Sequence, residues 1–260
     1  MPHPRLEQRL FVLQPLNDIA PDLIHPIQKE SISTLLDFCQ DQSPIEKRKE
    51  SLQNPLQRFD FSAFNFIAIE GNIGAGKSSL TQMMAEDFNA KPIFERFADN
   101  PFLPKFYKDK ERYAFALEMS FLADRYQQIS DDLSQLDLFK DFIIADYDVF
   151  KSLIFSKITL QEDEFLLYRT LFYQVYKDIK RPDLYVYLHQ NIDRLQQNIK
   201  KRGRNYERNL ESDYLDKIHF GYLDFIKNNP QFKVKIIDMS DSDLIENRHD
   251  YLWLLQHIQE

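Results

Sequence analysis

The 260-residue sequence contains a single cysteine, Cys39. One thiol cannot form a disulfide within the chain or supply a cysteine cluster for a metal, and the six histidines are scattered. Because proteins of reducing compartments rarely depend on disulfides, this composition favours a cytoplasmic location.

Excess basic charge and long apolar runs are also missing. The formal net charge is −8 at pH 7, which argues against general nucleic-acid binding, since that needs positive charge to displace counterions from phosphates. No stretch approaches the roughly 20 apolar residues that span a bilayer. The N-terminus lacks a signal-peptide pattern. We therefore expect a soluble protein with neither a membrane nor a nucleic-acid partner.

Glycine is scarce, and three of the five glycines fall in the stretch 71–78, GNIGAGKS. This stretch fits the phosphate-loop pattern G-x-x-x-x-G-K-[ST] at every fixed position. A strand-like apolar run precedes it, and helical spacing follows. A chance glycine turn before a helix is the simpler alternative.

In a phosphate loop, successive backbone N–H groups and the N-terminus of the following helix form an anion site. Lys77 is expected to reach the β- and γ-phosphates of ATP, and the Ser78 hydroxyl to bind Mg²⁺. The residues predicted to bind ATP are Gly71, Asn72, Ile73, Gly74, Ala75, Gly76, Lys77, Ser78 and Ser79.

Residues 1–58 differ from the rest of the chain, because seven prolines interrupt them. We predict a strand at 10–13, a short helix at 31–38 and a polar linker at 42–57. The sequence thus predicts an extension with a linker at 1–58 and one large domain at 59–260.

Beyond residue 58, short apolar runs alternate with helical stretches, the last of them at 244–258. The predicted strands are 66–70, 92–95, 142–146, 184–188 and 234–238. This alternation predicts an α/β fold with a doubly wound, five-stranded parallel sheet. Ligands of such sheets bind beyond the carboxyl ends of the strands. Glu70, Glu95 and Asp146 each close a predicted strand, so we expect all three to face one crevice.

The segments 94–102, FERFADNPF, and 200–205, KKRGRN, together with the glycine loop, resemble the deoxynucleoside kinases. The likeness is greatest to the bacterial deoxyadenosine/deoxyguanosine kinase branch and runs from about residue 65 to 225. It implies a phosphate-loop kinase that transfers the γ-phosphoryl of ATP to the 5′-hydroxyl of a deoxynucleoside and requires Mg²⁺. It also implies a homodimer, formed through helices at 113–128 and 161–177.

The resemblance assigns roles to two acids. Glu95 matches the glutamate that accepts the proton of the 5′-hydroxyl, and a solvated acid at a strand end is the alternative. Asp146 matches a Walker-B-like acid that helps to hold Mg²⁺, and a helix-capping aspartate is the alternative.

The chain departs from the family directly after its third predicted strand. The family usually has acid-Arg-Ser there, whereas this chain has Asp146-Tyr147-Asp148. Either another cation replaces the arginine, or activity is weakened. The candidate cations are Arg96, Lys151 and Arg125.

The resemblance also places substrate-binding residues. Tyr107 matches a tyrosine that binds the 3′-hydroxyl, and Glu118 stands where the family reads the base with glutamine. A carboxylate there favours base edges that present donors. Arg125 lies two helical turns further on and matches a substrate-site arginine, although a Glu118–Arg125 ion pair is the alternative. Ser152 replaces an acid that some members carry.

Residues 202–207 resemble the family's lid. Arg202 and Arg204 are expected to close over the ATP phosphates and to support catalysis with Lys77, because guanidinium groups suit oxyanions. Glu207 matches a glutamate that holds the 3′-hydroxyl together with Tyr107. A solvated basic loop is the alternative.

The first 40 residues or so resemble the C-terminal part of hydroxymethyldihydropterin pyrophosphokinase. The pattern begins with Pro2-His3-Pro4-Arg5 and continues through Arg9 and Phe11. In that family the positions of His3 and Arg9 contact ATP phosphates, and that of Phe11 lies by the pterin. Because its sheet and paired aspartates are missing here, the segment is a relic, the tail of a fused polypeptide, or a plain surface extension.

These observations predict an ATP-dependent deoxynucleoside kinase of nucleotide salvage, with a purine deoxynucleoside favoured and deoxycytidine possible. One alternative is a thymidylate-type nucleoside monophosphate kinase, although no clear basic set for the acceptor's phosphate is present. The other is a weakly active or inactive nucleotide-binding module that is fused to, or docked on, a pterin pyrophosphokinase. An arginine or lysine near Glu95 and Asp146 would weaken this last alternative.

Overall fold

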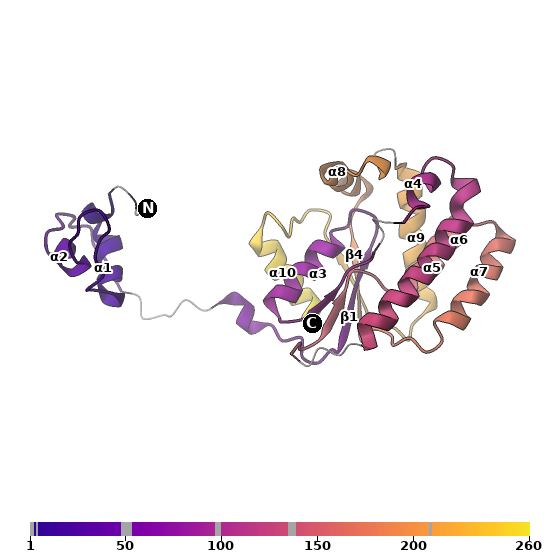
Figure 1. The fold of residues 1–260 in the computed structure, drawn as a ribbon, viewed down its shortest axis with the longest axis horizontal. Helices are drawn as coiled ribbons and strands as arrows, with labels where there is room; N and C mark the ends of the chain where they lie inside the picture. The colour runs from indigo at the N-terminus through magenta and orange to yellow at the C-terminus, as the bar shows by residue number, and fades with distance from the viewer. Residues whose placement is uncertain (1–2, 4, 48–53, 97–99, 135–138, 208–209) are drawn as a thin grey trace. The chain divides into compact units, whose positions relative to one another are not determined.

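A computed structural model describes residue 3 and residues 5–47, 54–96, 100–134, 139–207 and 210–260 (Figure 1). The chain forms two compact units, Met1–Gln53 and Asn54–Glu260. Parts of three sequence predictions lie outside the described residues. These are two prolines of the pyrophosphokinase pattern, residues 48–53 of the linker and residues 97–99 of the 94–102 motif.

The first unit contains the helices α1 (Leu10–Ile19) and α2 (Ile32–Asp37). The helix predicted near α2 is confirmed, and the Ser31 hydroxyl caps it by accepting a backbone N–H of its first turn. The strand predicted at 10–13 is wrong, because these residues begin α1. Leu13 is fully buried there. A run of four apolar residues cannot by itself distinguish a strand from a helix, and here helical packing prevails.

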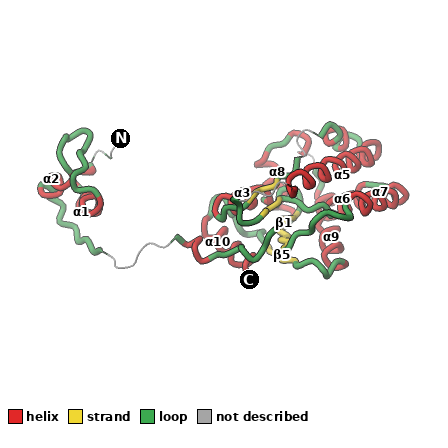
Figure 2. The backbone as a smooth tube through the Cα atoms, turned by 60° about the horizontal axis from the view of Figure 1, so that its bottom comes forward, coloured by secondary structure: helices red, strands yellow, loops and turns green. Residues whose placement is uncertain are grey.

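The second unit is an α/β domain with a five-stranded parallel sheet, as predicted (Figures 1 and 2). The strand order is β2-β3-β1-β4-β5. The strands are β1 (Phe66–Gly71), β2 (Lys91–Ile93), β3 (Ile143–Ala145), β4 (Leu184–His189) and β5 (Val234–Asp238). The helices are α3 (Lys77–Asp87), α4 (Leu103–Phe106), α5 (Lys110–Ser134), α6 (Lys151–Thr159), α7 (Glu162–Val175), α8 (Ile192–Arg202), α9 (Ser212–Asn228) and α10 (Arg248–Gln259). The 3-10 helices are Leu6–Gln8, Pro55–Arg58 and Asn205–Glu207.

Two strands are shorter than predicted. The edge strand β2 ends at Ile93, so Glu95 lies in the segment beyond it. The neighbouring strand β3 ends at Ala145, directly before Asp146. Because β2 and β3 are parallel neighbours, both acids still follow carboxyl ends at the same edge of the sheet. No helix in the described part of the chain combines the length and the apolar character needed to cross a bilayer.

Alternate residues of β1 enter opposite faces of the sheet, as the pleat of a strand requires. Ile67 and Ile69 belong to a core cluster with side chains of α3 and α10. Phe66 and Ala68 belong to clusters that involve α5, α6, α7 and α9. Figure 1 accordingly places α3 and α10 on one side of the sheet and these other helices on the opposite side.

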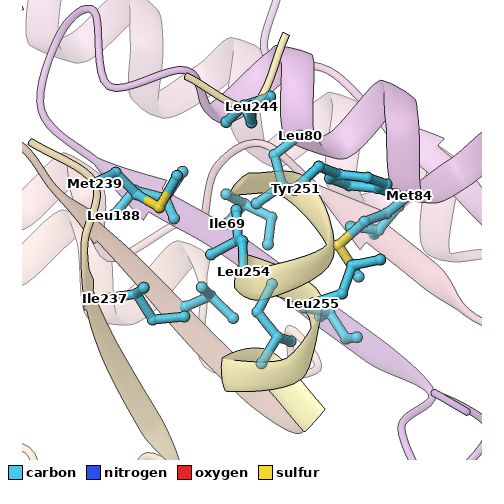
Figure 3. Close-up of a cluster of buried hydrophobic side chains, with 14 of the residues drawn as sticks. Ile69, Leu80, Met84, Leu188, Ile237, Met239, Leu244, Tyr251, Leu254 and Leu255 are labelled. Atoms are coloured by element: carbon cyan, nitrogen blue, oxygen red, sulfur yellow. The ribbon is translucent and has the colours of Figure 1, made fainter. Parts of the chain in front are cut away.

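The cluster beneath α3 and α10 carries much of the packing on its face of the sheet. Figure 3 shows Leu254 and Leu255 of α10 pointing toward Ile69 of the sheet and Met84 of α3. Leu254 is fully buried. The final helix therefore closes the core next to the strand that leads into the phosphate loop.

We expect Leu254→Ala to lower the free energy of unfolding by about 2–5 kcal/mol, because it leaves a cavity in this cluster. Urea denaturation of the full chain, followed by circular dichroism, measures the change. The matched control is Gln256→Ala on the exposed face of the same helix, for which the change should stay within about 0.5 kcal/mol. Equal stability of the two variants would show that α10 contributes little to the core.

Candidate active site

The loop between β1 and α3 owes its shape to glycine. At Gly71, with φ of 151°, a Cβ would lie 2.6 Å from the carbonyl oxygen of Leu188 on β4. Gly76, with φ of 88°, is left-handed and directly precedes α3. Side chains at either position would strain the backbone. The predicted strand, glycine loop and helix are therefore all present, in the predicted order.

Asn72 fixes this loop against the rest of the domain. Its side-chain amide donates to the carbonyl oxygen of Leu215 on α9 at 2.7 Å, and its Oδ1 accepts the N–H of Ile73 at 2.8 Å. The contribution of Asn72 in this structure is therefore to hold the loop in place.

Lys77 opens α3 and folds back over the loop. Its Nζ donates to the carbonyl oxygens of Gly71 at 3.1 Å and Asn72 at 2.9 Å. Burial, supported by the charge of Lys151, lowers the pKa of Lys77 to about 8. The N–H groups in the first turn of a helix have no partner within the helix, so those of Lys77, Ser78 and Ser79 are suited to bind an anion.

Two cavities meet at this loop. A cavity of about 350 Å³ extends from the loop toward α8 and the segment after β5. A smaller cavity of about 120 Å³ extends toward α5 and α6. Both cavities are lined by Lys77, Ser78, Arg202 and Arg204. One ligand on the loop can therefore be brought against a second ligand in the smaller cavity.

Asp146 links the loop to the smaller cavity. One carboxylate oxygen, Oδ2, accepts a hydrogen bond from the Ser78 hydroxyl. The other, Oδ1, accepts the backbone N–H of Glu95 at 2.8 Å. Glu95 and Asp146 both line the smaller cavity, as predicted for two of the three strand-end acids.

The Glu95 carboxylate is held by two cations. Arg125 of α5 donates to its Oε1 from Nε at 2.9 Å and from Nη2 at 2.5 Å. Lys151 of α6 donates to its Oε2 from Nζ at 2.6 Å. Burial alone would raise the pKa of Glu95, but the charges of Lys151 and Arg125 outweigh it and hold the pKa well below its ordinary value. The carboxylate is therefore ionised at neutral pH.

Tyr147, which stands where an arginine was expected, does not reach this site. Its side chain is fully buried in the core cluster that includes Phe66 and Tyr168. Of the three candidate replacement cations, Arg125 and Lys151 contact Glu95, whereas the side chain of Arg96 is exposed. Two cations thus stand beside the predicted base although the arginine is missing.

Glu70 contradicts the expectation that three acids share the crevice. Its side chain is fully buried, where it accepts the N–H of Asp148 and the hydroxyl of Tyr222 on α9, each at 2.7 Å. The reason is the pleat of β1, which places Glu70 on the same face as Phe66 and Ala68. Glu70 therefore connects the sheet to α9.

Glu118 and Arg125 line the smaller cavity from α5, as predicted. The two side chains, both among the described residues, are not hydrogen-bonded to each other, in contrast to the alternative of a direct pair. Arg125 instead contacts Glu95 and donates from Nη1 to the Ser152 hydroxyl at 2.7 Å. Glu118 accepts the hydroxyl of Thr159 on α6 at 3.0 Å. Burial raises the pKa of Glu118 to about 7.

The predicted lid residues Arg202, Arg204 and Glu207 also line the smaller cavity. Arg202 and Arg204 both form ion pairs with Glu207, the second at 3.3 Å. Tyr107 lines the same cavity, and its ring stacks on that of Tyr206 with centroids 5.8 Å apart. The lid arginines are thus placed between the two cavities.

Sequence reasoning missed one wall of the larger cavity. Arg194 and Asn198 of α8 line it, together with Asp243 and Leu244 in the segment after β5. Arg194 donates to Asp243 at 2.9 Å, and Asn198 donates to the carbonyl oxygen of Gly74 at 2.9 Å. This wall lies beyond the carboxyl ends of β4 and β5, where ligands of parallel sheets usually bind. That tendency was the feature of the sequence that could have predicted it.

The site also offers oxygen atoms that suit a magnesium ion. Ser78 and Asp146 present a hydroxyl and a carboxylate side by side at the phosphate loop. Mg²⁺ is usually held by one or two such protein ligands together with phosphate oxygens and water. Among the described residues, no group of three or more His, Cys, Asp or Glu side chains is placed to hold a metal. The donor set therefore fits a metal that arrives with a nucleotide.

Comparison with known proteins agrees with this geometry. The family model "Deoxynucleoside kinase" matches residues 67–260. A deoxyguanosine kinase of Bacillus subtilis is 34% identical over 199 residues, which cover 75% of this chain and 96% of the relative. A deoxyadenosine kinase of Lactobacillus acidophilus is 30% identical over 203 residues, covering 75% and 94%.

A solved structure supports the fold independently. The deoxyadenosine kinase from M. mycoides with bound dATP superposes with a TM-score of 0.65 at 23% identity, covering 75% of this chain and all of that one. The family match, the relatives and the two cavities that meet at a phosphate loop agree with one another. The chain belongs to the deoxynucleoside kinase family.

Proposed function

We propose that this kinase transfers the γ-phosphoryl group of ATP to the 5′-hydroxyl of a deoxynucleoside, with a purine deoxynucleoside favoured and deoxycytidine possible. The observation that carries the proposal is the meeting of the two cavities at Lys77 and Ser78. The larger cavity takes ATP and the smaller one the nucleoside. The similarity to deoxyguanosine, deoxyadenosine and deoxyadenosine/deoxycytidine kinases supports this substrate class.

Glu95 is the proposed general base. Its carboxylate lines the nucleoside cavity, and its backbone N–H is held by Asp146 beside the phosphate loop. Each carboxylate oxygen has more than one acceptor position, so the bonds to Arg125 and Lys151 leave room for the 5′-hydroxyl. The base takes the proton of that hydroxyl while the hydroxyl oxygen bonds to the γ-phosphorus. The bond between this phosphorus and the β,γ-bridging oxygen breaks, and ADP leaves.

Positive charge near the reacting atoms comes from several residues. Lys77 lies over the phosphate loop, and Arg202 and Arg204 face both cavities. We propose that these three cations neutralise the transferring phosphoryl group. Lys151 takes the place of the missing arginine, since it contacts Glu95 while Tyr147 lies in the core.

The remaining site residues position the two substrates. We propose that Tyr107 and Glu207 hold the 3′-hydroxyl, since both line the nucleoside cavity. The backbone of Gly71–Ser79 binds the ATP phosphates. Ser78 and Asp146 would hold Mg²⁺, which would supply positive charge to offset that of the phosphates.

We further propose a homodimer that forms through α5 and α7. Large apolar side chains are exposed on these helices, with 39% of Tyr126, 53% of Leu167 and 55% of Tyr173 accessible. Light scattering on the full chain measures the mass. A monomer at micromolar concentration would contradict the proposal.

The extension near 1–58 is proposed to be a domain separate from the kinase domain at 59–260. The burial of Leu56 in the kinase core supports a boundary closer to residue 54. Phe11, Ile19 and Phe38 are exposed, which supports packing of this unit against another protein surface. We propose that this surface belongs to a fused or docked pterin pyrophosphokinase. The single cysteine supports a cytoplasmic location. The proposed reaction, which phosphorylates free deoxynucleosides, supports a role in nucleotide salvage.

An acceptor panel tests the function. The full chain is incubated with ATP, Mg²⁺ and each of the four deoxynucleosides, and in parallel with the deoxynucleoside monophosphates and hydroxymethyldihydropterin. We expect rapid phosphorylation of one or two deoxynucleosides. ATP binding without any reactive deoxynucleoside would overturn the proposal, and phosphorylation of a monophosphate or of the pterin would favour a different kinase.

A further inference from the structure

Glu118 lines the nucleoside cavity together with several aromatic side chains. Its side chain is 2% exposed, and the aromatic side chains of Phe106, Phe121 and Phe155 line the same cavity. Apolar, aromatic walls suit the flat faces of a nucleobase. A carboxyl group among such walls is therefore placed to meet the edge of the base.

The two oxygen atoms of Glu118 differ in their contacts. Oε1 accepts the hydroxyl of Thr159 at 3.0 Å. Oε2 is buried and has no hydrogen-bond partner among the described residues. Because a buried polar atom without a partner is costly, Oε2 calls for a donor from a ligand in this cavity. An ionised carboxylate accepts hydrogen bonds and donates none.

Arg125 supplies hydrogen-bond donors to the same cavity. Its guanidinium has five N–H donors, and it makes three hydrogen bonds among the described residues, two to Glu95 and one to Ser152. Two N–H groups thus remain without a hydrogen-bond partner among the described residues. The cavity therefore presents donors from Arg125 and acceptors from Glu118, both on α5.

Guanine is the base whose edge complements this pair. Its O6 is an acceptor, and its N1–H and 2-amino group are adjacent donors. Adenine and cytosine each present a single amino donor next to a ring-nitrogen acceptor, so either base gives Glu118 one donor where guanine gives it two adjacent donors. Thymine matches O6 and N1–H with its O4 and N3–H but has a carbonyl oxygen in place of the amino group.

We propose that Glu118 makes this kinase select deoxyguanosine, by accepting the N1–H and the 2-amino group of guanine while Arg125 donates to O6. This inference rests on the proposed function, because it names the base in the same nucleoside cavity. Arg125 stays hydrogen-bonded to Glu95 when it binds the base. Recognition of the base is therefore coupled to the position of the catalytic carboxylate.

The protonation of Glu118 gives the selection a pH dependence. Burial raises the pKa of Glu118 to about 7, against the charge of Arg125 and the bond from Thr159. Above this pH the carboxylate is ionised and accepts both guanine donors, whereas below it the carboxyl carries a proton and suits adenine better. The titratable groups that act on it come from its own helix and from four other parts of the fold: Arg125, Glu95, Lys151, Tyr168 and Tyr214.

Steady-state kinetics on the full-length wild-type chain test the selection without any mutation. The kcat/KM is measured at saturating ATP and Mg²⁺ for deoxyguanosine, deoxyinosine, deoxyadenosine, deoxycytidine and thymidine. A well-placed pair of hydrogen bonds discriminates by about 5- to 150-fold, so we expect deoxyguanosine to exceed deoxyadenosine by a factor in this range. Deoxyinosine lacks only the 2-amino group and should fall between the two.

Glu118→Gln then tests the residue itself. Glutamine has nearly the same shape but carries both a donor and an acceptor. We expect the ratio of kcat/KM for deoxyguanosine over deoxyadenosine to fall by about 10-fold or more, mainly through KM, and its rise between pH 6 and 8 to disappear. The matched control is Glu111→Gln, an exposed carboxyl on the same helix, which should leave the ratio unchanged.

The outcomes separate this inference from the proposed function. If the wild type phosphorylates deoxynucleosides but prefers deoxyadenosine or deoxycytidine, or treats deoxyinosine like deoxyguanosine, the inference fails and the kinase activity stands. An unchanged ratio in a folded Glu118→Gln variant also overturns the inference. If no deoxynucleoside reacts at all, the proposed function fails first.

Discussion

Glu95→Gln is expected to lower kcat by about 10²–10⁴-fold, the range that a general base typically contributes. Glutamine keeps the size of the side chain but cannot take up the proton of the 5′-hydroxyl. ATP binding should change little, because Glu95 does not line the larger cavity. Single-turnover phosphoryl transfer at saturating substrates measures the loss, and calorimetric titration with ATP provides the control.

The position of Glu95 makes this prediction specific. Its carboxylate is ionised and held from two sides by Arg125 and Lys151. A glutamate with a purely structural role would change thermal stability without a selective loss of kcat. Turnover at the wild-type rate in Glu95→Gln would remove the residue from the base role.

Lys151→Met is expected to reduce kcat by about 10²–10³-fold, which is typical for the loss of one charged group that stabilises a transition state. Methionine fills a similar volume but removes the ammonium group that lies 2.6 Å from Glu95 Oε2. Lys151→Arg keeps the charge and should recover a large part of the turnover. Steady-state kcat for the three proteins measures the effect.

The matched control for Lys151 lies on the same helix. Lys157 pairs with Asp224 on the surface, and its side chain is 61% exposed. Exposed pairs contribute little, so Lys157→Met should leave both kcat and the melting temperature nearly unchanged. If Lys151→Met and Lys157→Met had equal turnover, Lys151 would not replace the missing arginine.

Much of the kinase fold was accessible from the sequence. The strands β1 and β4 are buried on both faces and have the nearly continuous apolar runs that parallel sheets need, whereas the edge strand β5 is only partly buried. The phosphate loop was identified from its match to the pattern G-x-x-x-x-G-K-[ST], and side chains at Gly71 and Gly76 would strain the backbone. Local steric requirements of this kind can be recognised directly in the sequence.

Contacts that depend on tertiary packing could not be predicted from local sequence patterns. Glu70 and Glu95 both follow apolar runs, yet the pleat of β1 buries Glu70 under α9 while Glu95 faces the nucleoside cavity. Likewise, Lys151 of α6 contacts the Glu95 carboxylate, whereas the side chain of Arg96, next to Glu95 in the sequence, is exposed. The apolar run at 10–13 was read as a strand because its length fits either element.

The position of the phosphate in the product tests the central claim most directly. The full-length chain is incubated with ATP, Mg²⁺ and its best deoxynucleoside, and the product is analysed by phosphorus–proton coupling in NMR spectra. Our account places the 5′-hydroxyl between Glu95 and the phosphate loop, so it predicts coupling of phosphorus to the 5′-methylene protons only. Coupling to the 3′-proton, or the absence of a nucleoside monophosphate, would contradict it.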